Sequence, residues 1–158
     1  MIKNILIVCT GNICRSPMAE ALMRQKLPEM VVYSAGLHAL YGAAVDRFAV
    51  DAVRKNGIDI SGHRARNISA WMVKEADLVL TMDGEQKRAI EVKYPAFENK
   101  VWRLGEYGNF DIPDPHQKGH LVFQESLSLI TQGIEEWTAY LLSFNRKKTG
   151  VLLHAASP

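Results

Sequence analysis

The sequence predicts an α/β fold: a single doubly wound domain in which helices flank a four-stranded parallel sheet. Short apolar runs alternate with amphipathic segments of helical length, and the chain of 158 residues has room for one domain. Strands that alternate with helices imply parallel pairing through right-handed crossovers. We therefore expect a ligand to bind beyond the carboxyl ends of the strands.

Four short apolar runs are the expected strands. The first is continuously apolar, which is typical of a parallel strand covered on both faces, and the turn residues Thr10-Gly11-Asn12 end it. The expected strands span residues 5–8, 30–33, 78–80 and 101–104.

Helix signals occupy the segments between and after these runs. Ser16 and Pro17 mark the first helix, because Ser is a good N-cap and Pro is tolerated at the first helical position. Asp83 and Gln86 have the spacing of a capping box. The other expected helices span residues 48–55, 69–75, 83–94 and 121–145. We assign residues 1–146 to the domain and expect a disordered tail at residues 147–158.

The composition excludes several classes of protein. Lysine plus arginine is 19 and aspartate plus glutamate is 17, a net charge of +2, so we expect no nucleic-acid partner. No apolar run approaches the ~20 residues of a membrane span. The N-terminus lacks the cleavage site of a signal peptide.

The two cysteines, Cys9 and Cys14, are too few and too close together for the disulfide framework of a secreted protein. The five histidines show no metal-ligand spacing around this pair, so we expect no metal and no cofactor. We expect a reducing, cytoplasmic location.

The loop from Cys9 to Ser16 carries the candidate chemistry. It joins a buried strand to a helix N-terminus, where backbone N–H groups and the helix dipole favour a bound anion. A positive environment favours the thiolate of Cys9, which is the nucleophilic form. Arg15 ends the loop with planar donors suited to two phosphate oxygens. The pattern predicts a phosphate held above the Cys9 sulfur, as a phosphocysteine intermediate requires.

Two other interpretations of this loop are weaker. A buried thiol at the end of a strand explains Cys9 but not Arg15 at the start of the following helix. A nucleotide-binding P-loop requires a Gly-Lys-Ser/Thr ending, and this loop ends in Cys-Arg-Ser.

A phosphomonoester also needs an acid that protonates the leaving oxygen. The loop before the last helix offers Asp111 and Asp114. Both are also ordinary turn residues, so the loop by itself does not choose between them.

The segment Val8-Cys9-Thr10-Gly11-Asn12-Ile13-Cys14-Arg15-Ser16-Pro17 resembles the signature of the low-molecular-weight protein tyrosine phosphatases. The likeness covers about residues 2–145. It extends through Ser34-Ala35-Gly36, Gly62-His63-Arg64-Ala65-Arg66, Thr81-Met82-Asp83 and Asp114-Pro115. The resemblance implies hydrolysis of protein phosphotyrosine, with Cys9 as nucleophile, Arg15 as phosphate clamp and Asp114 as general acid and base.

The resemblance also implies roles around the loop. Asn12 suits a left-handed backbone position and would be tied to Ser34 and His63, while Ser16 would donate to the thiolate. Asp83 would brace the site or simply cap its helix. The supports are thus Ser16, Ser34 and His63, and the substrate-binding residues are Thr10, Gly11, Asn12, Ile13, Cys14, Leu40 and His116.

Two pocket residues leave questions open. His116 stands where the family usually has an aromatic residue, and we expect Leu40 and Tyr41 to form the opposite wall. Cys14 could trap an oxidised Cys9 as a disulfide or could be a small buried helix-start residue.

Three alternatives share the fold or the loop. Related arsenate reductases need cysteines beyond the loop, and this chain has none after Cys14. Protein-arginine phosphatases typically have Thr where Ile13 stands. A catalytically silent phosphate-binding module is the third. Ser34-Ala35-Gly36-Leu37 resembles the bacterial branch of the family, which makes a tyrosine autokinase of exopolysaccharide export a candidate partner.

Overall fold

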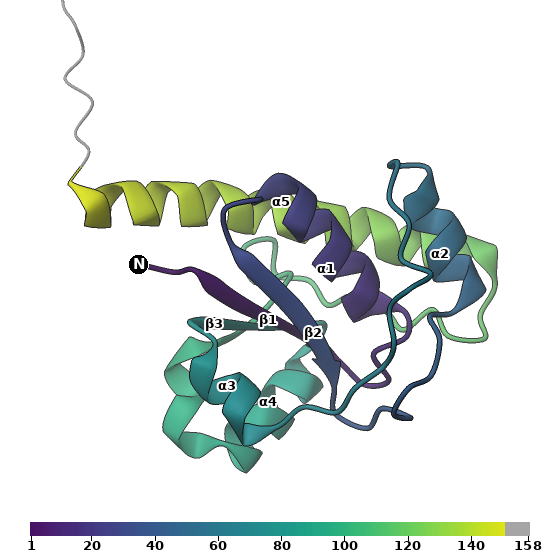
Figure 1. Ribbon diagram of the computed structural model, residues 1–158, viewed down its shortest axis with the longest axis horizontal. Helices are drawn as coiled ribbons and strands as arrows, with labels where there is room; N and C mark the ends of the chain where they lie inside the picture. The colour runs from purple at the N-terminus through teal and green to yellow at the C-terminus, as the bar shows by residue number, and fades with distance from the viewer. Residues whose placement is uncertain (151–158) are drawn as a thin grey trace, which may run out of the picture.

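The structure is a computed structural model in which residues 1–150 are described. Its centre is a four-stranded sheet, parallel throughout, in the order β2-β1-β3-β4 (Figure 1). The strands are β1 (Asn4–Cys9), β2 (Val31–Gly36), β3 (Leu78–Thr81) and β4 (Val101–Arg103). The predicted fold class is confirmed, although β2 continues three residues past the expected end at residue 33.

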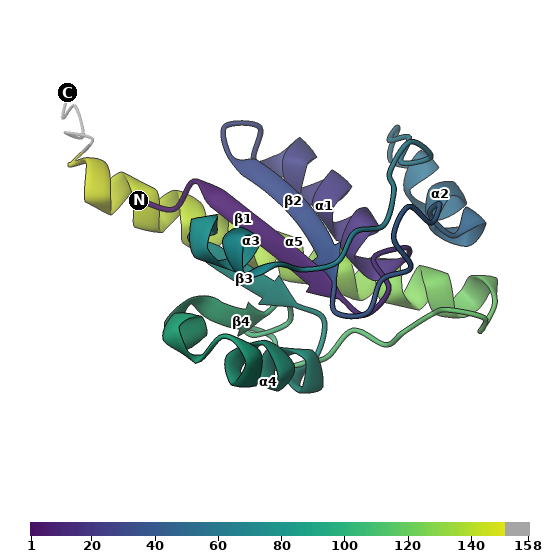
Figure 2. The ribbon, with the colours of Figure 1, turned by 60° about the horizontal axis from the view of Figure 1, so that its bottom comes forward.

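Helices cover both faces of the sheet. They are α1 (Arg15–Lys26), α2 (Arg47–Arg54), α3 (Ala70–Glu75), α4 (Gly84–Lys93), the 3₁₀ helix η1 (Pro95–Lys100) and α5 (His120–Thr149). Helices α1, α2 and α5 lie on one face, and α3 and α4 lie on the other (Figure 2). This arrangement is the doubly wound pattern predicted from the sequence.

Strand β1 is buried on both sides, which explains its continuous apolar run. Ile5, Ile7 and Cys9 pack into the core beneath α1 and α5. Leu6 and Val8 point the opposite way, into the smaller core beneath α3 and α4. Because side chains alternate between the two faces of a strand, the Cys9 side chain lies on the α1 side of the sheet.

Two helix starts differ from the sequence prediction. Ser16 is not an N-cap: α1 begins at Arg15 and its N-cap is Cys14. The Ser16 hydroxyl is instead used within the loop described below. Gln86 does not close a capping box on Asp83, because its Oε1 accepts from the N–H of Met82, 2.9 Å away.

The last helix is longer than expected. It continues to Thr149, so residues 147–149 of the expected tail are helical, and residues 151–158 lie outside the described residues. Asn145 fixes the late turns, because its side chain accepts from the N–H of Ile2 and donates to the carbonyl of Ile2, both at 2.9 Å. Among residues 1–150, no helix combines the length and the apolarity that a membrane crossing needs.

Gly36 lets the end of β2 approach the loop that follows β1. A Cβ at this position would lie 2.6 Å from the carbonyl oxygen of Thr10 and 3.1 Å from the Asn12 side chain. The separation from the Thr10 oxygen is far below van der Waals contact, and that oxygen belongs to the backbone, so the position requires glycine.

Candidate active site

The loop between β1 and α1 wraps around the sulfur of Cys9. The Sγ of Cys9 lies 2.8 Å from the Oγ of Ser16. It also accepts a hydrogen bond from the backbone N–H of Asn12 at 3.2 Å. Both contacts stabilise negative charge on sulfur once the Ser16 hydroxyl points its proton at it.

Asn12 fixes the direction of that proton. Its Nδ2 donates to the hydroxyl oxygens of Ser16 and Ser34, each 2.9 Å away. The Ser16 oxygen therefore acts as an acceptor toward Asn12, and its own hydrogen remains for the Cys9 sulfur. Asn12 has a φ of +56°, the left-handed conformation predicted for it and one that Asn tolerates better than most residues.

His63 supports the same network from outside. Its Nε2 lies 3.1 Å from the backbone carbonyl of Asn12 and 3.2 Å from the Asn12 Oδ1. Both are acceptors, and Oδ1 also receives the N–H of Arg66 at 3.1 Å. His63 must therefore carry a proton on Nε2. Burial lowers the pKa of His63 below its usual value of 6.5, which favours the neutral ring over the imidazolium.

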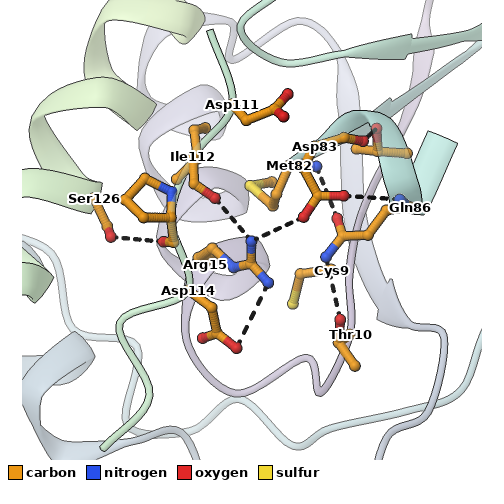
Figure 3. Close-up of polar contacts among 12 residues, drawn as sticks. Cys9, Thr10, Arg15, Met82, Asp83, Gln86, Asp111, Ile112, Asp114 and Ser126 are labelled. Carbon is orange, nitrogen blue, oxygen red and sulfur yellow. Dashed lines mark hydrogen bonds and ion pairs between the residues drawn. The ribbon is translucent and has the colours of Figure 1, made fainter. Parts of the chain in front are cut away.

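Arg15 is buried beside the sulfur and held from behind (Figure 3). Its Nη1 donates to the carbonyl oxygen of Ile112 at 2.9 Å and lies 3.5 Å from the Oδ2 of Asp83. Asp83 also caps α4, since its Oδ1 accepts from the N–H of Gln86 at 2.8 Å. The two roles that the sequence left open for Asp83 therefore occur together.

The loop before α5 separates the two acid candidates. The Oδ2 of Asp114 lies 3.9 Å from the Nη2 of Arg15, and the carboxylate is half exposed. Asp111 instead pairs with Arg103 at 3.1 Å and points away from the sulfur (Figure 3). Ser126 of α5 donates to the carbonyl of Pro113 at 2.8 Å and so anchors the loop that bears Asp114.

A cavity of about 280 Å³ opens above the sulfur. Most of the predicted substrate-binding residues line it. They are Thr10, Gly11, Ile13, Cys14, Leu40 and His116, together with Cys9, Arg15 and Asp114. Asn12 does not line the cavity, because its side chain is turned into the support network, and the expected wall residue Tyr41 does not line it either.

Sequence reasoning assigned no role at the site to three further residues. His38 and Ala43 line the cavity, and Gln86 reaches it through Thr10. The Nε2 of Gln86 donates to the Oγ1 of Thr10 at 3.2 Å, so α4 holds one side of the loop. Such contacts join positions 76 residues apart, which spacing within a motif does not reveal.

A second group of polar side chains lies at the rim of the cavity. The sulfur of Cys14, a carboxylate oxygen of Asp46 and a ring nitrogen of His116 all lie within 4.8 Å of one another. Burial, and then the charge of Asp46, raises the pKa of the Cys14 thiol well above its usual range. Cys14 is therefore a thiol at neutral pH and does not compete with Cys9 as a nucleophile.

A larger hollow of about 630 Å³ lies on the far side of His63, beside Glu20 and Arg24. Among residues 1–150, no cysteine, serine or threonine lines it. The chemistry therefore belongs to the smaller cavity, where a buried sulfur, a guanidinium and a carboxylate meet at the carboxyl end of β1. These groups on this fold define a cysteine-dependent phosphohydrolase.

Comparison with known proteins identifies the family. The model for "Low molecular weight phosphotyrosine protein phosphatase" matches residues 4–148, and the chain belongs to this family. It is 51% identical over 137 residues to the probable low molecular weight protein-tyrosine-phosphatase EpsP of Ralstonia nicotianae, a match that covers 87% of this chain and 94% of that protein. The enzyme is thus a protein tyrosine phosphatase that acts on tyrosine-phosphorylated protein.

Solved structures agree in fold. Vibrio vulnificus Wzb in complex with benzylphosphonate superimposes with a TM-score of 0.85 at 30% identity, covering 89% of this chain and 99% of that one. The YwlE arginine phosphatase from Geobacillus stearothermophilus superimposes with a TM-score of 0.86, also at 30% identity, covering 92% and 96% of the two chains.

Proposed function

We propose that Cys9, Arg15 and Asp114 divide the hydrolysis of phosphotyrosine between them, with a covalent phosphocysteine intermediate. The observation that carries this proposal is the 2.8 Å contact between the Cys9 sulfur and the Ser16 hydroxyl, whose proton Asn12 directs toward the sulfur. A buried sulfur that receives a hydrogen bond beside a guanidinium is prepared to act as an anionic nucleophile.

In the first step the Cys9 sulfur attacks phosphorus in line with the tyrosyl oxygen. The S–P bond forms while the P–O ester bond breaks, and Asp114 gives its proton to the departing phenolate. Arg15 binds the equatorial oxygens, whose charge must be stabilised through the transition state. Ile112 and Asp83 hold the guanidinium in place for this task.

In the second step water releases phosphate from the sulfur. Asp114, now a carboxylate, takes a proton from the attacking water while the S–P bond breaks. Its half-exposed position is compatible with both steps, because the group must meet solvent as well as substrate. Arg15 supplies the positive charge in each step.

Specificity for phosphotyrosine depends on the walls above the sulfur. Ile13 offers an apolar side chain to a phenyl ring, and Leu40 and His116 line the same cavity. Similarity to an arginine phosphatase makes phosphoarginine the second candidate substrate class. The apolar Ile13, at the position where that class typically has Thr, favours the tyrosyl ring.

A panel of matched phosphopeptides tests the proposal. We expect turnover of the phosphotyrosine peptide, little turnover of phosphoserine or phosphoarginine peptides, and the same rates with and without chelator. Cys9→Ser should abolish turnover while phosphate analogues still bind. Substantial turnover by that variant would refute the covalent mechanism, and binding without any turnover by the unmodified enzyme would indicate a silent phosphate-binding module.

The proposed partner and cellular location rest on the relatives and on the chemistry of the thiolate. The relative named EpsP and the motif at residues 34–37 support a phosphorylated tyrosine autokinase of exopolysaccharide export as partner. An enzyme that works through a free thiolate needs reducing surroundings, which supports a cytoplasmic location. Arsenate reduction is disfavoured, because both cysteines of the chain lie in the one loop.

A further inference from the structure

We propose that Cys14, Asp46 and His116 form a binding site for a zinc ion, and that zinc bound there closes the active-site cavity. The inhibitory part rests on the proposed function of the neighbouring Cys9, whereas the binding part does not. The three residues come from different parts of the chain: the position before α1, the N-cap of α2, and the loop that carries Asp114.

The distances suit a tetrahedral ion. With zinc bond lengths of about 2.0–2.3 Å, two ligand atoms of a tetrahedral site lie about 3.3–3.6 Å apart. The Nδ1 of His116 and the Oδ2 of Asp46 are already 3.5 Å apart. The sulfur of Cys14 lies within 4.8 Å of a carboxylate oxygen of Asp46 and of a ring nitrogen of His116. Rotation of the half-exposed His116 ring would adjust its distance to the sulfur, and rotation of the Cys14 side chain would adjust the distance from the sulfur to Asp46.

Asp46 is held in place while one of its oxygens is left for a ligand. Its Oδ1 accepts from the N–H of Phe48 at 2.9 Å as the cap of α2. Its backbone N–H donates to the carbonyl of Ile13 at 2.9 Å, which ties Asp46 to the phosphate loop. The remaining Oδ2 faces His116.

Sulfur, imidazole and carboxylate are the ligand types that zinc uses, whereas magnesium and calcium prefer oxygen alone. On binding, the Cys14 S–H bond breaks, a Zn–S bond forms, and the proton passes to water. Zinc stays divalent, so no oxidant or reductant takes part. Three protein ligands leave a fourth position for water at the mouth of the cavity.

The charges nearby permit a divalent ion. Asp46 lies at the candidate site, and the guanidinium of the neighbouring Arg15 is paired with the carboxylates of Asp83, at 3.5 Å, and Asp114, at 3.9 Å. The buried sulfur of Cys14 points to the side of Asp46 and His116.

Zinc at this site would block the reaction in two ways. Cys14 and His116 both line the cavity, so an ion between them occupies the space that the substrate ring needs. The backbone N–H of His116 also donates to the Oδ1 of Asp114 at 3.1 Å. Zinc that holds His116 in place would therefore also restrict Asp114, the residue proposed as general acid. We expect inhibition that is competitive with the phosphopeptide and reversed by chelator.

Cobalt provides the binding test, because a Co²⁺–thiolate bond gives a near-ultraviolet charge-transfer band. The full chain with Cys9→Ser retains Cys14 as its one thiol. We expect the band in this variant, its loss on adding equimolar zinc, and a strong reduction when Asp46→Asn or His116→Ala is added. No band in the Cys9→Ser protein, or an undiminished band in both double variants, would overturn the site.

The activity test uses Asp46→Asn in the otherwise unmodified enzyme. Asparagine keeps the helix cap but loses the anionic ligand. We expect unchanged turnover without metal and at least tenfold more zinc for half-inhibition. Asp51→Asn, which removes an equal charge from an exposed position on α2, should match the unmodified enzyme. Equal zinc sensitivity in all three proteins would place the inhibiting ion elsewhere. Absence of turnover in metal-free enzyme would refute the proposed function, while the cobalt band would still test the site.

Discussion

Ser16→Ala should separate the activation of the sulfur from the stability of the loop. The substitution removes one hydroxyl, and with it the hydrogen bond to Cys9 Sγ at 2.8 Å. A hydrogen bond to a charged group contributes about 1.5–3 kcal/mol. Because every 1.4 kcal/mol is a factor of ten, kcat/KM for phosphotyrosine should fall about 10- to 150-fold. The rate of Cys9 alkylation by iodoacetamide at neutral pH should fall with it, since that rate reports the thiolate population.

Ser34→Ala is the matched control for this variant. Both serines are fully buried, and both accept from the Nδ2 of Asn12 at 2.9 Å, but only Ser16 is hydrogen-bonded to the sulfur. The two variants should lose similar stability, about 1 kcal/mol each in urea unfolding. Only Ser16→Ala should show the large loss of alkylation rate. Equal losses of activity and alkylation in the two variants would refute the idea that Asn12 directs the Ser16 proton to Cys9.

Three further outcomes follow from the site. Asp114→Asn should reduce turnover most for phenyl esters with poor leaving groups, and an equal loss across a leaving-group series would show that Asp114 is not the acid. The lowered pKa of His63 means that the unfolded chain takes up its proton first, so stability is full above pH 6.5 and falls as the pH drops through the folded pKa. His63→Gln should lessen this acid loss of Tm; an unchanged acid dependence would contradict it. Gly36→Ala should reduce both Tm and kcat/KM, because its Cβ would meet the Thr10 carbonyl at 2.6 Å, and an unaffected enzyme would show that the loop can shift freely.

Most of the fold could be predicted from the sequence because the patterns that indicate its strands and helices involve residues close together in the chain. The continuous apolar run of β1 and the Asp83 cap of α4 each depend on residues a few positions apart. The catalytic loop is also contiguous, so Cys9 and Arg15 could be recognised together. The turn from the end of β1 into the start of α1 then brings the Cys9 sulfur and the Arg15 guanidinium close together.

The features that could not be predicted from local patterns depend on contacts between residues far apart in the chain. For Ser16, local spacing suggested a helix cap, which is wrong, whereas the resemblance to the family placed its hydroxyl beside the Cys9 sulfur, where the structure has it at 2.8 Å. The bonds of Asn145 to Ile2 prolong α5, and those residues lie 143 positions apart. The grouping of Cys14 with Asp46 and His116 likewise appears only when three segments have folded together.

The long last helix has a mechanical consequence for the chemistry. Near its C-terminal end, α5 is hydrogen-bonded through Asn145 to the chain just before β1. About 28 Å away along the helix, Ser126 is hydrogen-bonded to the loop that bears Asp114. Strand β1 carries Cys9 at its opposite tip. Helix α5 and strand β1 are therefore connected near residue 2. The far end of α5 positions the proposed proton donor Asp114, and the far end of β1 positions the sulfur of Cys9. Damage at Asn145, remote from any substrate, would loosen the spacing on which proton transfer depends.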